Sequence, residues 1–125
     1  MSASDNIRMA VSELRQASVV LQQEATTLIN EKENTNHQKS NEVTHHQFRL
    51  KAKQLELGSQ NLNDQDRQRI AQEAKDLEQH INTTQREMDE LNRQATDTSN
   101  SKRMQAQNLE SKAAELERIA GSLYT

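Results

Sequence analysis

Residues 70–95 have the sequence IAQEAKDLEQHINTTQREMDELNRQA, in which apolar side chains recur every seven residues. One line of such positions contains Ile70, Leu77, Thr84 and Leu91. A second line contains Ala74, Ile81, Met88, Ala95, Lys102, Leu109, Leu116 and Leu123, and only Lys102 in it is polar. Two apolar lines with this spacing form one stripe on an α-helix and predict packing against a neighbouring helix. Because the second line keeps its phase through the polar residues 96–103, we predict one helix over about 64–121, either continuous or loosened at 96–103.

A second helix is predicted over about residues 5–57. Its apolar positions are again seven apart, at Ile7, Leu14, Leu21 and Leu28, and then at Val43, Leu50 and Leu57. No residue from 30 to 42 is apolar, and the step from Leu28 to Val43 is one residue longer than two heptads. The stripe therefore changes phase across this polar run. The run fits either a loop that interrupts the helix or a solvated stretch of helix.

Turn and capping residues separate the two helices. Residues 58–63 are predicted to form the turn, with Gly58 ending the first helix in a left-handed conformation. Asn63 or Asp64 is expected to cap the second helix, and Gly121 to end it. At the N-terminus, Ser4 or Asp5 is the expected cap of the first helix.

The composition favours an all-α fold. The chain of 125 residues has no Pro, two Gly and only 2% aromatic residues, and its net charge is −3. Such a chain propagates helix easily but cannot fill a thick core. We therefore predict a single helical domain spanning 1–125, folded as a long antiparallel helical hairpin or coiled coil. The alternative is a chain that breaks near residue 35 or residue 99 into a three- or four-helix bundle.

The predicted turn sets the expected register of the hairpin. Folding the chain back at residues 60–61 places side by side residues whose numbers sum to about 121. The polar run 30–42 would then face residues 79–91, and Ile81, Met88 and Leu91 would be only half covered. Either a break in the helices or a second chain would have to complete the core, and a dimeric four-helix arrangement would do so.

No catalytic or cofactor-binding constellation is apparent in the sequence, so we expect a protein that is not an enzyme and has no cofactor. There is no Cys, no nucleophile elbow and no phosphate-binding glycine loop. The histidines His37, His45, His46 and His80 do not share a ligand spacing along one helix, and no metal site is predicted. The fold-back could bring His80 near His45, slightly out of register.

The remaining partner classes are limited by charge and hydropathy. A slightly acidic chain that nearly lacks aromatic residues argues against nucleic-acid binding and against a DNA mimic. No apolar run is long enough for a membrane span, and no small-molecule substrate is evident. The N-terminus lacks the pattern of a cleaved signal peptide, so we expect a cytoplasmic protein or one exported without such a peptide.

These observations predict a non-catalytic helical interaction or scaffold protein that acts through coiled-coil packing with itself or with a partner protein. The alternative is a leaderless secreted helical protein, or its secretion chaperone or adaptor. The expected interface residues are Leu14, Leu21, Leu28, Ile81, Met88, Leu91, Leu109 and Leu116. Thr84 and Lys102 are the candidates for polar residues that fix the register of the helices.

Overall fold

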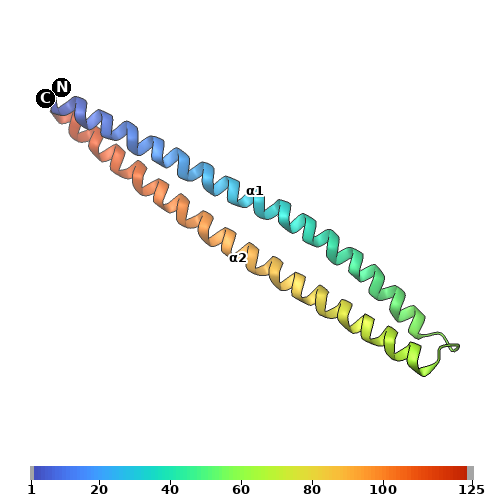
Figure 1. Ribbon diagram of the computed structural model, residues 1–125. Helices are drawn as coiled ribbons and strands as arrows, with labels where there is room; N and C mark the ends of the chain where they lie inside the picture. Colours follow the sequence, from blue (N-terminus) through green and yellow to red (C-terminus); the bar gives the residue numbers. More distant parts are fainter. Residues whose placement is uncertain (1, 124–125) are drawn as a thin grey trace. The chain divides into compact units, whose positions relative to one another are not determined.

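The computed structural model describes residues 2–123, and it shows an all-α helical hairpin (Figure 1). Helix α1 spans Ala3–Leu57 and helix α2 spans Asp64–Ser122. Both polar runs, 30–42 and 96–103, are helical throughout. The prediction of a helical hairpin is thus confirmed, and the alternative of a three- or four-helix bundle is wrong. Solvated Asn, Lys and Glu side chains keep the run 30–42 helical because nothing in it blocks the backbone hydrogen bonds.

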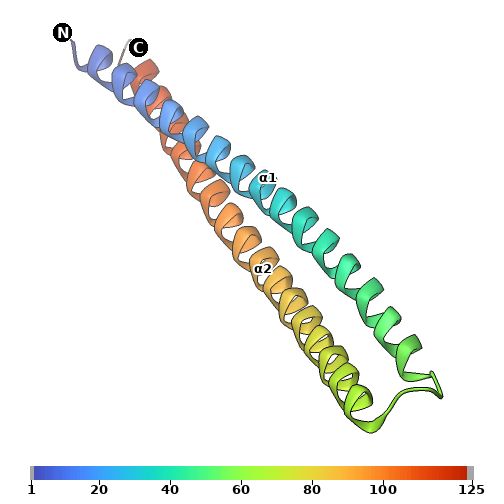
Figure 2. The ribbon, with the colours of Figure 1, turned by 45° about the vertical axis from the view of Figure 1, so that its right-hand side comes forward.

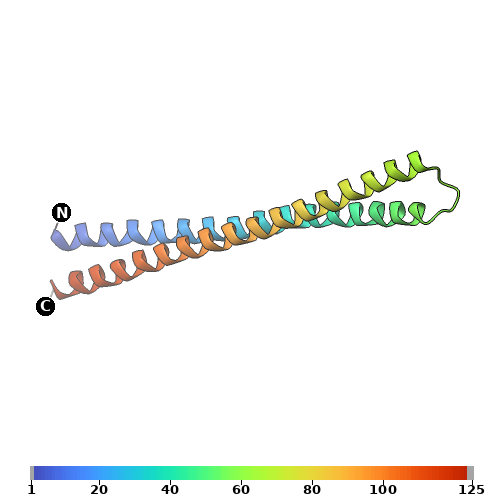
Figure 3. The same cartoon turned by 90° about the horizontal axis from the view of Figure 1, so that it is seen from below.

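By their contacts, the described residues form two compact units. Residues 2–31 pack with residues 94–123 in what we call the terminal unit, and residues 32–93 form the loop unit. In the terminal unit, the start of α1 lies beside the end of α2 (Figure 1). In the loop unit, residues 58–63 carry the chain from the end of α1 to the start of α2 (Figures 2 and 3).

The helix ends differ in part from the expected caps. Ser2, rather than Ser4 or Asp5, caps α1: its Oγ accepts a hydrogen bond from the N–H of Asp5 at 3.2 Å. The N–H of Ser2 lies 3.4 Å from Oδ2 of Asp5 and donates back, which completes a capping box. At α2, Asn63 is the cap, because its Oδ1 accepts the N–H of Asp66 at 2.7 Å.

The glycines do not end the helices in the predicted way. Neither Gly58 nor Gly121 has a positive φ. The N–H of Gly58 instead donates to the carbonyl of Leu55 at 3.2 Å, so a tightened last turn ends α1. Gly121 lies inside α2, which continues to Ser122. The left-handed cap expected at Gly58 is therefore wrong, because hydrogen bonds three residues apart already satisfy the last carbonyls.

The register of the hairpin differs from the expected one by five residues, about 1.4 helical turns. Residues that face each other in the loop unit have numbers that sum to 126, as in the ion pairs Lys39–Glu87 and Lys53–Glu73. With this register, the first turn of α2 extends beyond Leu57, the last residue of α1. The guanidinium of Arg67 then reaches back to the carbonyls of Leu57 and Ser59, at 2.7 and 3.1 Å.

Candidate functional site

In the terminal unit, the contact between the helices is made by small side chains. Ala95, on the predicted second line, is buried in this unit. The other buried residues are again seven apart on each helix: Ser4, Val11, Ser18 and Ala25 on α1, and Ser99, Ala106, Ala113 and Ala120 on α2. We call these positions the small-residue seam. Small side chains allow two helix backbones to approach closely, because the spacing of packed helices depends on the side chains between them.

Two buried hydroxyl groups show how close this approach is. Oγ of Ser18 on α1 donates to the carbonyl of Ala106 on α2 at 3.2 Å. Oγ of Ser99 on α2 donates to the carbonyl of Ala25 on α1 at 3.3 Å. Each serine thus reaches the backbone of the opposite helix, which a leucine-filled contact would not allow. Both serines are 1% exposed or less.

The predicted leucine line lies beside this seam rather than in it. Leu14 follows the seam residue Val11 by three positions, whereas Arg15 follows it by four, so the two lie on opposite sides of the seam. On α2, Leu109 and Glu110 stand in the same relation to Ala106. Arg15 pairs with Glu117 at 2.6 Å and lies 3.9 Å from Glu110, so the polar sides of the two helices meet.

The leucines of both helices therefore share the other side of the terminal unit. We call this side the leucine flank; it consists of Leu14, Leu21, Leu28, Leu109 and Leu116, all of them partly exposed. A shallow hollow of about 360 Å³, bordered by Val20, Leu28 and Lys102, adjoins it. Lys102 leaves the apolar line by extending Nζ to Glu24 at 2.7 Å.

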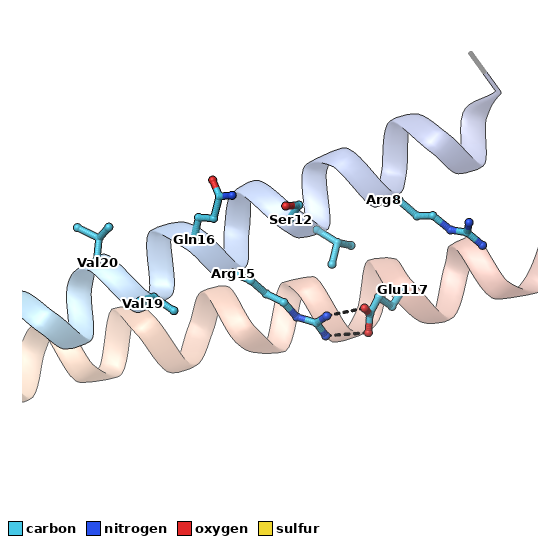
Figure 4. Close-up of a pocket in the computed structure, with 8 residues that line it drawn as sticks. Arg8, Ser12, Arg15, Gln16, Val19, Val20 and Glu117 are labelled. Atoms are coloured by element: carbon cyan, nitrogen blue, oxygen red, sulfur yellow. Dashed lines mark hydrogen bonds and ion pairs between the residues drawn. The ribbon is translucent and has the colours of Figure 1, made fainter.

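A larger groove, of about 600 Å³, lies on the polar side of the terminal unit, where Val11 and Val19 contribute its apolar wall. In Figure 4 the Arg15 side chain extends from α1 to Glu117 on α2, and Val20 points away from α2. The bond to the Glu117 carboxylate raises the pKa of Arg15 above its ordinary value. Val19 and Val20 are each 49% exposed. The groove has charged rims and an apolar floor, but it contains no pair of carboxylates and no histidine.

The remaining predicted interface residues lie in the loop unit. Ile81 is 7% exposed and belongs to the buried contact between the helices, whereas Met88 and Leu91 are partly exposed. Of the two predicted polar register residues, Thr84 is buried. A further polar pair was not predicted from the sequence: the side-chain N–H of Asn36 donates to Oδ1 of Asn92. The polar run therefore takes part in the helix contact through Asn36.

A row of charged and histidine side chains crosses the loop unit. On α1, Lys39, His46 and Lys53 are seven apart, and they face Glu87, His80 and Glu73 on α2. Lys39 pairs with Glu87 at 2.9 Å and Lys53 with Glu73 at 2.7 Å. Between these ion pairs the His46 and His80 rings meet edge to face, with their centroids 4.5 Å apart. His80 thus faces His46 rather than His45, as the actual register requires.

Glu42 lies beside His46 and His80, and we call these three residues the histidine layer. Its Oε1 lies 2.9 Å from Nε2 of His80 and 3.7 Å from Nε2 of His46. The hydrogen bond from the His80 ring lowers the pKa of Glu42 below its ordinary value. All four histidines stand out in the sequence, but Glu42 does not, because only the observed register places His80 opposite the helical turn that carries Glu42 and His46.

Comparison of the chain with protein-family models, with curated proteins and with solved structures gave no match. Over the described residues, neither helix has a stretch apolar enough to cross a lipid bilayer.

Proposed function

We propose that the chain is a non-catalytic interaction protein whose leucine flank packs against helices of another chain, in the first instance a second copy of itself. The observation that carries this proposal is the displacement of the leucines from the seam. Small residues make the contact between α1 and α2 in the terminal unit, so five leucines on two helices are left partly exposed on one side. A further helix packed on this flank would bury the part of each leucine that is still exposed, and that burial would favour association.

A second hairpin is a suitable occupant because two hairpins packed on their apolar sides form a four-helix arrangement. The symmetry is also simple, since the same flank of each copy would face the other around a two-fold axis. The charged rim at Lys102 and Glu24 borders the flank and would restrict how far the second copy can shift along it.

The test is the mass of the chain in solution, measured by light scattering over a range of concentrations. We expect the wild-type chain to form a dimer, and Leu21→Lys to be monomeric with an unchanged helical circular dichroism spectrum. The matched control is Leu55→Lys, which places the same charge on α1 at a leucine that is 72% exposed in the loop unit. A monomeric mass for the wild type at every concentration would exclude self-association, and equal masses for both variants would exclude the leucine flank.

A further inference from the structure

The geometry points to a binding site for a divalent transition-metal ion of the zinc class, formed by Glu42 and His46 of α1 and His80 of α2. One ligand atom from each side chain is available, and these three atoms all lie within 4.8 Å of one another. The site lies in the loop unit and is independent of the leucine flank.

The distances fit an ion between the three side chains. Ligand atoms 2.0–2.2 Å from a tetrahedral ion are roughly 3.3–3.6 Å from each other. The separations from Oε1 of Glu42, 2.9 Å to Nε2 of His80 and 3.7 Å to Nε2 of His46, fall on either side of that range. Small side-chain rotations would therefore bring all three atoms to coordination distance. Two imidazoles and one carboxylate suit Zn²⁺, Co²⁺, Ni²⁺ or Cu²⁺ better than Ca²⁺ or Mg²⁺, which prefer oxygen ligands.

His46 supports this inference because its hydrogen bonding is incomplete. Its side chain is only 16% exposed. Among the described residues, Nδ1 of His46 is buried without a hydrogen-bond partner, and Nε2 lies beyond hydrogen-bond distance of Glu42. Buried polar atoms normally have partners, but an ion bound at Nε2 would not reach Nδ1 across the ring, so the support comes from Nε2. An ion bound at Nε2 would give this ring a strong partner on the side that faces Glu42 and His80.

The rest of the row holds the ligands in place. Glu42 and His46 are four residues apart, so they project from the same side of α1. His80 comes from α2. Its position along α1 is fixed by the ion pairs Lys39–Glu87 and Lys53–Glu73, one heptad away on either side. Those two layers each combine a Lys with a carboxylate, whereas the layer between them combines the Glu42 carboxylate with two imidazoles. A metal ion in this middle layer would link α1 to α2 through its three ligands.

Glu42 and His80 are about half exposed, at 46% and 51% of their side chains. The ion would therefore lie at the surface of the loop unit, with a water molecule as its remaining ligand. Binding would replace the hydrogen bond between Glu42 and Nε2 of His80 by bonds from both groups to the ion.

The test is titration of the full, untagged chain with Co²⁺, whose visible absorption reports tetrahedral coordination, followed by displacement with Zn²⁺. We expect one ion per chain, and a loss of affinity of at least about tenfold in His46→Gln and in His80→Gln, since even residues that only support a ligand contribute about that much. His37→Gln is the matched control: His37 is an exposed histidine of the same helix and should leave the affinity within about twofold. Circular dichroism checks that each variant is helical.

A second readout does not depend on the variants. Zn²⁺ should shift the ring nitrogen signals of His46 and His80, but not those of His37, in NMR spectra of the wild-type chain. It should also raise the melting temperature in a concentration-dependent way. Absence of saturable Co²⁺ binding, or an equal loss of affinity in His37→Gln and His80→Gln, would overturn the proposed site.

Discussion

Ser18 on α1 and Ser99 on α2 form a reciprocal pair across the terminal unit. Each donates its hydroxyl proton to a backbone carbonyl of the opposite helix, seven residues along the seam from the other serine. Ser18 reaches the carbonyl of Ala106, and Ser99 reaches that of Ala25. The two bonds are therefore related by an approximate two-fold axis, and they fix both the spacing and the register of the helices in this unit.

Removing either hydroxyl should lower the free energy of unfolding slightly, and enlarging the side chain should lower it more. We expect Ser18→Ala to lower the free energy of unfolding by about 0.5–1.5 kcal/mol, the value of one buried hydrogen bond. Ser18→Leu should cost about 1–3 kcal/mol, because the added carbons force the backbones apart. Urea unfolding measures both values.

The control for these variants is Ser12, which is exposed on the same helix. Ser12→Ala should change the free energy of unfolding by no more than about 0.5 kcal/mol. If Ser18→Leu were as well tolerated as Ser12→Leu, the helices would not be in close contact at this seam.

The seam also shows what could be predicted from the sequence. The heptad lines predicted two long helices, and the turn and capping residues predicted the loop at 58–63 and a cap at Asn63 or Asp64. They did not predict which line makes the contact, because Leu14, Leu21 and Leu28 are the more hydrophobic candidates. Only the structure shows that the small residues next to these leucines make the contact, because they let the two helix backbones approach more closely. A buried serine in a heptad line cannot be recognised from one sequence, because its hydrogen bond is made to a carbonyl of the other helix.

The histidine layer could not be predicted for a related reason. The expected turn paired residues with numbers that sum to 121, which is five residues, about 1.4 helical turns, away from the observed register. Which histidine faces His80 depends on the conformation of the loop 58–63. Beside that loop, the bonds from Arg67 to the carbonyls of Leu57 and Ser59 hold the start of α2 against the end of α1. The sequence contained all three residues of the candidate metal site, but their proximity is a property of the loop geometry.

The ion pair Lys53–Glu73 should make the stability of the chain depend on pH. The hydrogen bond from Lys53 lowers the pKa of Glu73 below its ordinary value near 4.5, and the positive charges of Arg69 and Arg49 add to this effect. Because the lowered pKa belongs to the folded state, the stabilisation is complete above about pH 4.5. It is lost as the pH falls through the folded-state pKa.

We therefore expect Glu73→Gln to flatten the decrease of the melting temperature below about pH 4.5, and to lower the melting temperature at neutral pH. Glu78→Gln is the control, since the described residues show no ion pair for Glu78. Melting curves between pH 3 and pH 7 compare the variants, as ordinary carboxyl groups titrate within that range. Identical slopes for wild type and Glu73→Gln would show that the ion pair does not contribute.

The pair Asn36–Asn92 predicts a non-additive response to substitution. The N–H of Asn36 donates to Oδ1 of Asn92, whereas Oδ1 of Asn36 is buried without a partner. Asn92→Leu alone leaves Asn36 with no bond and should cost about 1–3 kcal/mol. The double variant Asn36→Leu/Asn92→Leu removes both polar groups, and it should be at least as stable as the wild type because two leucines can pack together.

Urea unfolding of the two single variants and the double variant gives the coupling energy. The expected coupling requires direct contact between residues 36 and 92, so additive costs would argue against the observed register in the loop unit.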